Sequence, residues 1–126
     1  MTPEGLKYTP EHEWAKVEGD IVTIGITDWA QEQLSDVVYV ELPTAGTVLK
    51  QMDAFGVVEA VKTVSDLYAP ISGEIVEVNA ALADDPALIN QSPYEGGWIM
   101  KIRLSDPQEL ETLLDAEGYQ ALVEEA

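Results

Sequence analysis

Lys62 is the side chain in this sequence that is best placed to react, because its position predicts an amine presented to solvent. The mostly apolar segment Phe55–Val61 ends just before it and polar residues follow, which indicates a tight hairpin with Lys62 at its tip. A tip lysine can simply keep the end of a strand in solvent. Lys62 is, however, one of only six cations, and it lies between the two copies of a repeated segment. Position alone therefore leaves both a structural and a chemical role open.

Other chemically capable side chains are few. The chain has no cysteine, so it has no disulfide, thiolate metal site or cysteine nucleophile, and any redox chemistry must come from an attached group. His12 is the single histidine, flanked by Glu11 and Glu13. A stable metal site needs three or four convergent ligands, and no His-Glu-x-x-His pattern is present. We therefore expect His12 to be a surface or half-buried residue that orders the N-terminal strand. Carboxylate-rich segments such as Asp84-Asp85 lack the loop spacing of a calcium site.

Composition limits the class of protein. The 126 residues include 24 acidic and six basic side chains, for a formal charge of -18, and 46% of residues are hydrophobic. This apolar fraction is enough for a core, so the charge is expected to cover a folded domain. Scattered cations argue against a nucleic-acid or anionic-membrane partner. No apolar stretch reaches the roughly 20 residues that span a bilayer, and no signal peptide is visible. The cytoplasm is the expected compartment, or the mitochondrion if a presequence has been removed.

Short apolar or alternating segments bounded by turn residues predict strands rather than long helices. Their number and spacing favour an all-β sandwich or barrel of two antiparallel sheets. The predicted strands are Ile21–Ile26, Val37–Leu42, Phe55–Val61, Gly73–Val78 and Trp98–Leu104.

Helices are predicted at the periphery. Asp28–Leu34 is expected to form two turns with Asp28 as the N-cap. Asp106, followed by Pro107, predicts the start of a C-terminal helix whose apolar stripe is Leu110, Leu113 and Leu114. Asp115 is expected to cap a second helix with Tyr119, Leu122 and Val123 on one face.

A short internal repeat surrounds Lys62. Pro43–Leu49 and Pro70–Val76 are each a Pro-x-x-Gly turn that leads into a strand. Two copies are too few for a solenoid, so they indicate a pseudo-symmetric pair of sheets.

The segment Val58–Glu74, which contains Lys62, resembles the lipoylation segment of the glycine cleavage system H protein family. Further segments agree in the same order along nearly the whole chain. They are Leu6-Lys7-Tyr8, His12-Glu13-Trp14, Gly25–Asp28, Ala30-Gln31, Val40–Pro43, Gly46, Gly73–Asn79, Pro86–Asn90, Ser92-Pro93-Tyr94 and Gly97-Trp98. One position departs from the family pattern, because Ala60 stands where a serine is usual. This removes a hydroxyl near the tip, which could alter the affinity of a ligase.

The resemblance implies a fold and a cofactor. The fold is a flattened barrel-sandwich hybrid of the lipoyl and biotinyl type, in a single domain over residues 1–126. Its core is expected at about 17–104 and its C-terminal helices at about 106–124. Lipoic acid is expected in amide linkage to Lys62, where the four methylenes extend a flexible tether and the amide removes the charge of the amine.

The resemblance also implies a carrier function rather than an independent enzyme activity. The lipoyl arm would carry the aminomethyl group from glycine decarboxylase (P protein) to the aminomethyltransferase (T protein). Dihydrolipoamide dehydrogenase (L protein) would reoxidise the arm, and a lipoate ligase would attach it. Because a shuttle must leave each partner, a monomer with transient contacts is expected.

Around His12-Glu13-Trp14, the resemblance suggests a cleft in which the loaded arm rests. Glu13 and Asp66 are the candidate contacts to a charged aminomethyl group, because a carboxylate stabilises a protonated amine. The alternative is that both are solvated surface acids. The large aromatic side chains could form a ligand platform, but in so small a domain we expect them mainly in the core. These are Trp14, Trp29, Tyr94 and Trp98.

Three alternatives remain open. A biotin carrier would also present a hairpin lysine, but methionines usually flank that lysine, and here Val61 and Thr63 do. A lipoate relay would use the lipoyl group of Lys62 as a donor to other complexes, which is compatible with glycine cleavage. An unmodified interaction module would need no cofactor.

Overall fold

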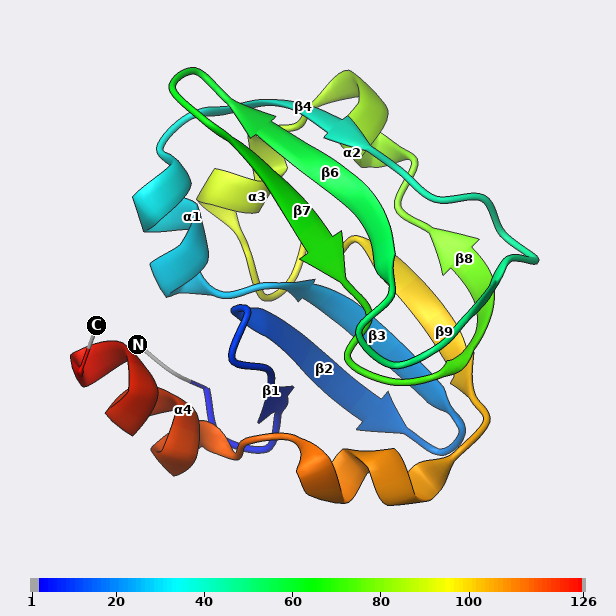
Figure 1. The fold of residues 1–126 in the computed structure, drawn as a ribbon. Coiled ribbons are helices and arrows are strands. Elements are labelled where there is room, and N and C mark those ends of the chain that lie inside the picture. The colour runs from blue at the N-terminus through cyan, green and yellow to red at the C-terminus, as the bar shows by residue number, and fades with distance from the viewer. Residues whose placement is uncertain (1–2, 126) are drawn as a thin grey trace.

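The computed structural model describes residues 3–125, which form two antiparallel β-sheets stacked on each other with short helices around them (Figure 1). One sheet has six strands in the order β1-β2-β3-β9-β8-β5, and the other has three in the order β4-β6-β7. The predicted fold class of two antiparallel sheets with flanking helices is confirmed. The strands are β1 (Lys7–Tyr8), β2 (Glu13–Glu18), β3 (Ile21–Ile26), β4 (Val37–Glu41), β5 (Val48–Leu49), β6 (Ala54–Ala60), β7 (Val64–Tyr68), β8 (Gly73–Val78) and β9 (Met100–Leu104).

The main core lies between the two sheets. Alternate side chains of each strand face inward because successive residues point to opposite faces. The six-stranded sheet contributes Ile24 and Ile102, and the three-stranded sheet contributes Val40, Val58 and Leu67, all nearly inaccessible to solvent. Burial of these branched side chains is the dominant stabilising contribution to such a small domain.

The two copies of the repeated segment lie side by side. Val48 pairs with Glu74 and Leu49 with Gly73, so β5 and β8 are neighbours in the six-stranded sheet. The repeat therefore does not place one copy in each sheet, as a pseudo-symmetric pair of sheets would. Instead the copies pair with each other, and the chain between them runs out through the β6–β7 hairpin and back.

Helix α1 (Asp28–Leu34) forms where predicted, but its N-cap is Thr27 and not Asp28. Thr27 has an extended backbone, and its Oγ1 accepts a hydrogen bond from the amide of Ala30 at 3.2 Å. Asp28 already lies in the first turn, where its carboxylate accepts a bond from Gln31 Nε2 at 2.9 Å. Two shorter helices follow later in the chain, α2 (Ala81–Asp84) and α3 (Leu88–Gln91).

The predicted C-terminal helices differ in type from the expectation. Asp106 caps a 3-10 helix, Pro107–Thr112, rather than an α-helix, and the apolar stripe is divided. Leu110 and Leu113 pack against the main core, whereas Leu114 packs against a separate cluster around Tyr8, Trp14 and Tyr119. The carboxylate of Glu109 accepts bonds from the amide and the hydroxyl of Ser72, which tie the 3-10 helix to the turn before β8 (Gly73–Val78).

Asp115 is the N-cap of helix α4 (Ala116–Glu124), as predicted, and its carboxylate accepts a bond from the amide of Gly118 at 2.8 Å. It lies beside β1 at the end of the six-stranded sheet, near the N-terminal segment (Figure 1). Among residues 3–125, no helix has the length and apolar character needed to cross a membrane.

Candidate functional site

Lys62 lies at the tip of the hairpin that joins β6 to β7, and this hairpin projects from one corner of the molecule (Figure 1). The amide of Ala60 donates to the carbonyl of Thr63 at 2.8 Å, which closes the turn. Lys62 is exposed, and so are its apolar neighbours Val61 and Val64, at 67% and 61%. The tip is also attached to the body, because the amide of Val61 donates to the carbonyl of Asp36 at 3.1 Å. The amine of Lys62 is therefore presented to solvent on a defined backbone.

A small pocket of about 120 Å³ opens beside the strand that descends from this tip. The β6–β7 hairpin, helix α1 with the end of β3 before it, and the turn that leads into the start of β2 form its walls. The lining is mostly apolar and includes three carboxyl groups. The lining residues are Glu11, His12, Glu13, Ile26, Trp29, Ala30, Leu34, Val58, Ser65, Asp66 and Leu67.

Both sequence-predicted contact residues, Glu13 and Asp66, line this one pocket. Asp66 is exposed on β7, as a solvated acid would be. Glu13 is 1% exposed, so it is not a surface acid. The structure thus brings together two carboxyl groups in very different environments, one hydrated and one buried.

The buried carboxyl of Glu13 has two hydrogen-bond donors. Thr9 Oγ1 donates to Oε1 at 2.5 Å, and the amide of Tyr68 donates to Oε2 at 3.2 Å. Burial nevertheless raises the pKa of Glu13 from 4.5 to about 7, because removal from water penalises the carboxylate more than these two hydrogen bonds stabilise it, and the neighbouring Glu11 charge raises the pKa further. A group with this pKa can hold or release a proton near neutral pH. It is also suited to gain its charge when a cation comes close.

His12 forms part of the pocket wall rather than a metal site. Its imidazole stacks on the indole of Trp29 with ring centroids 4.3 Å apart. Burial lowers the pKa of His12, and the nearby Glu11 carboxylate partly opposes this shift. Among the residues that the structure describes, no group of three or more His, Asp or Glu side chains could hold a metal ion.

The large aromatic residues divide between core and pocket. Trp14 is 1% exposed, as expected for the core, and its indole N–H donates to the carbonyl of Pro93 at 2.9 Å. Tyr94 and Trp98 pack against the same cluster while remaining partly exposed. Trp29 instead lines the pocket, and nothing in its sequence context distinguished it from the other tryptophans.

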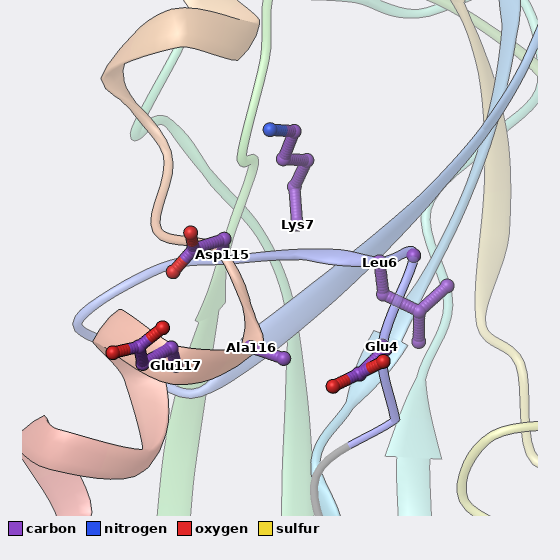
Figure 2. A pocket seen from close by; sticks show the side chains of 7 residues that line it. Glu4, Leu6, Lys7, Asp115, Ala116 and Glu117 are labelled. Carbon is purple, nitrogen blue, oxygen red and sulfur yellow. The ribbon is translucent and has the colours of Figure 1, made fainter.

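A larger cavity, of about 380 Å³, lies elsewhere, between the N-terminal segment and the start of α4. Its carboxylates, from Glu4, Asp115 and Glu117, are spread around the opening and do not converge on one point (Figure 2). It is remote in sequence from the hairpin and contains neither predicted contact residue. Its size is therefore no argument for function, and the smaller pocket beside the hairpin is the candidate site.

Comparison with known proteins agrees with this arrangement. The family profile described as Glycine cleavage H-protein matches residues 6–126. The chain is 57% identical over 123 residues to the glycine cleavage system H protein of Anaeromyxobacter sp. (strain K), covering 98% of this chain and 96% of that protein. It is 60% identical over 123 residues to the protein of the same name from Symbiobacterium thermophilum, with the same coverage.

A solved structure is also similar. The crystal structure of a glycine cleavage system H protein from Mycobacterium marinum superposes with a TM-score of 0.86 at 40% sequence identity, covering 97% of this chain and 98% of that one. The agreement extends over the strands, the hairpin and the C-terminal helix, because so little of either chain is left out. The chain belongs to the glycine cleavage H-protein family.

Proposed function

We propose that this chain is a lipoyl carrier of the glycine cleavage system, with lipoic acid attached in amide linkage to Lys62. The observation that carries the proposal is the exposed lysine at the tip of a rigid two-stranded hairpin in a protein of this family. An attaching enzyme needs access to the amine and a defined backbone around it, and the hairpin offers both. When attached, the lipoyl group supplies the disulfide and dithiol chemistry that a chain without cysteine lacks.

The dimensions of the hairpin fit such an arm. Asp66 is four residues beyond Lys62, or about 13 Å along an extended strand at roughly 3.3 Å per residue. A lysine side chain extended by the lipoyl chain has roughly ten single bonds, which span about 12 Å when extended. The far end of the arm can therefore lie in the pocket beside Asp66 while its base stays at the tip.

The charges of the pocket fit a cationic cargo. Glu13 and Asp66 both line it, and Glu11 lies at the same wall. An aminomethyl group carries a basic nitrogen, and a carboxylate beside that nitrogen favours its protonated form. The approach of this cation would in turn stabilise the charged form of Glu13. We propose that the loaded arm rests here, with Asp66 as a hydrated contact and Glu13 as a buried one.

The carrier itself has no catalytic residue in this proposal. Glycine decarboxylase loads the arm, the aminomethyltransferase unloads it, dihydrolipoamide dehydrogenase reoxidises it, and a lipoate ligase attaches it. A monomer in the cytoplasm fits a carrier that visits several enzymes, since tight binding to one would block transfer to the next. The same exposed linkage would also be open to an enzyme that relays lipoate.

The attachment is tested by a tryptic mass spectrum after treatment with a lipoate ligase and lipoate. Modified Lys62 resists trypsin, so we expect one peptide, Gln51–Lys101, with a lipoyl mass increment, because Lys62 is the single Lys or Arg between its ends. The Lys62→Arg variant is the matched control and should take up no lipoyl group. Cleavage after unmodified Lys62, with the ligase active on another acceptor, would overturn the carrier proposal.

The resting pocket is tested separately with Asp66→Asn and Glu13→Gln. Both should speed the loss of cargo from the loaded protein alone, measured as ammonia released in the absence of partner enzymes. Asp84→Asn is the control, because Asp84 is an exposed aspartate on α2 that does not line the pocket. If the two pocket variants release ammonia at the control rate, the arm does not rest at these carboxyl groups.

A further inference from the structure

The hydroxyl of Tyr119, on the C-terminal helix α4, joins two walls of the pocket, one just before β2 and one just after β3. Its oxygen lies 2.8 Å from His12 Nδ1 and 2.7 Å from Thr27 Oγ1. We propose that Tyr119 is a positioning residue for the lipoyl arm, which holds these walls at the separation that the arm requires. The inference rests on the proposed resting pocket, and it assigns a role in that site to the C-terminal helix.

The two groups bound by Tyr119 belong to different segments beside the pocket. His12 lines the pocket and is followed directly by Glu13. Thr27 caps α1, the helix that carries Trp29, Ala30 and Leu34 into the pocket. A backbone bond joins the same two segments, from the amide of Thr27 to the carbonyl of His12 at 3.0 Å. Tyr119 adds a second connection at the level of the side chains.

One direction of these hydrogen bonds gives each hydroxyl proton an acceptor. Thr27 Oγ1 accepts from the amide of Ala30 and can donate its own proton to Tyr119. Tyr119 can then donate its own proton to His12 Nδ1 if the imidazole is neutral. The burial that lowers the pKa of His12 favours this neutral form. In the direction from Thr27 to Tyr119 to His12, each hydroxyl donates one bond and His12 is the tautomer protonated at Nε2.

His12 passes this constraint to the surface of the pocket. Its backbone has a φ of 73°, in the left-handed region that few non-glycine residues adopt. Its ring stacks on Trp29, so fixing the imidazole also fixes the indole. A side chain on α4 thus controls an aromatic wall of the pocket without itself lining that pocket.

A purely structural role for Tyr119 must be separated from this one. Tyr119 is 1% exposed, and its ring stacks on Tyr8 with centroids 4.8 Å apart. Tyr8 provides the matched control, because it is equally buried in the same stack while its hydroxyl donates to the carbonyl of Pro3, away from the pocket. Tyr119→Phe and Tyr8→Phe each remove one hydroxyl and keep both rings.

The first test needs no lipoyl group. Hydrogen exchange of the Thr27 amide reports separation of the two walls, and we normalise it to the global stability of each variant. Tyr119→Phe should speed this exchange about tenfold, the effect expected from losing about one net hydrogen bond. Tyr8→Phe should leave it unchanged. Equal acceleration in both variants, or none in Tyr119→Phe, would overturn the proposal.

The second test uses lipoylated, loaded protein and measures ammonia release without partner enzymes. We expect Tyr119→Phe to release cargo several-fold faster than the wild type and Tyr8→Phe to match the wild type. If the wild type releases ammonia more slowly than Glu13→Gln, and Tyr119→Phe releases it as slowly as the wild type, Tyr119 does not position the arm. If the wild type releases cargo as fast as Glu13→Gln, the resting pocket itself is wrong, whereas the exchange of Thr27 still decides whether Tyr119 joins the walls.

Discussion

The buried carboxyl of Glu13 makes a specific prediction about how stability depends on pH. Its pKa rises from 4.5 to about 7 on folding, because burial penalises the carboxylate. A shift of roughly 2.5 units corresponds to about 3 kcal/mol of folding free energy, at about 1.4 kcal/mol per unit. The substitution Glu13→Gln removes the titrating proton while keeping the size of the side chain.

The sign of the effect follows from which state holds the proton. Below about pH 4.5 the carboxyl is protonated in both states, so its ionisation costs nothing. Between about pH 4.5 and 7 the unfolded chain loses this proton while the folded protein keeps it. The free energy of unfolding therefore falls as the pH rises, by up to about 1.4 kcal/mol per unit. Above about pH 7 the full cost, about 3 kcal/mol, is present and constant.

The assay compares urea unfolding of the wild type and Glu13→Gln at several pH values. The other carboxyl groups are common to both proteins and largely cancel in the difference. The NH2 group of the glutamine must lie beside one of two donors, the Thr9 hydroxyl or the Tyr68 amide. This changes the stability difference between the two proteins by the same amount at every pH. The test is therefore the slope of that difference against pH and not its absolute value. We expect the variant to gain about 3 kcal/mol relative to the wild type between pH 4.5 and 7.

Glu18→Gln is the charge-matched control, because Glu18 is an exposed carboxylate at the other end of β2. Its stability difference from the wild type should change little over the same pH range. A difference between wild type and Glu13→Gln that stays flat from pH 5 to 7 would refute the assignment of a buried, proton-holding carboxyl. It would also remove the basis for charging Glu13 on approach of a cation.

Two further substitutions test the frame that holds the pocket. A Cβ added at Gly25 would lie 2.7 Å from the Trp14 indole, so Gly25→Ala should lower the free energy of unfolding in urea by about 1 to 3 kcal/mol. A Cβ added at Gly96 has its nearest contacts at 3.8 Å, so Gly96→Ala should lower it far less. Equal losses in the two variants would contradict this packing. Asn90 accepts from the Val37 amide at 2.9 Å and donates to the Ser35 carbonyl at 2.7 Å, on either side of Asp36. Asn90→Ala should therefore cost about 1 to 3 kcal/mol and speed exchange of the Val61 amide at the hairpin tip, whereas the exposed Gln91→Ala should do neither.

Local patterns predicted much of the fold because a strand with one buried face leaves a period of two in the sequence. The segments Ile21–Ile26 and Gly73–Val78 were predicted with the bounds that β3 and β8 have. The strands β1, β2 and β7 were not among the predicted segments. β1 has only two residues, in β2 three buried residues are followed by three exposed ones, and in β7 three consecutive exposed residues precede Leu67.

The carboxyl pair of the pocket could be anticipated only through the family resemblance. Composition and spacing make Glu13 one acid among 24, and its burial depends on hydrogen bonds from Thr9 and from Tyr68, which is 55 positions away. Asp66 is visible as a residue near the lysine, but its nearness to Glu13 depends on how the hairpin packs against β2. No local pattern encodes a distance between side chains that belong to different sheets.

The connection from Tyr119 to His12 shows the same limit more strongly, since 107 positions separate the two residues. The sequence predicted a C-terminal helix with Tyr119 on its apolar face, and this is sufficient to bury the ring. It does not reveal that the hydroxyl reaches beyond the core to the pocket wall. A buried tyrosine hydroxyl must find a partner, because an unsatisfied one costs about 1 to 3 kcal/mol. Here one partner, His12, lines the pocket and the other, Thr27, caps the helix that carries Trp29 into it, so the same requirement that stabilises the helix against the sheet also orders the site.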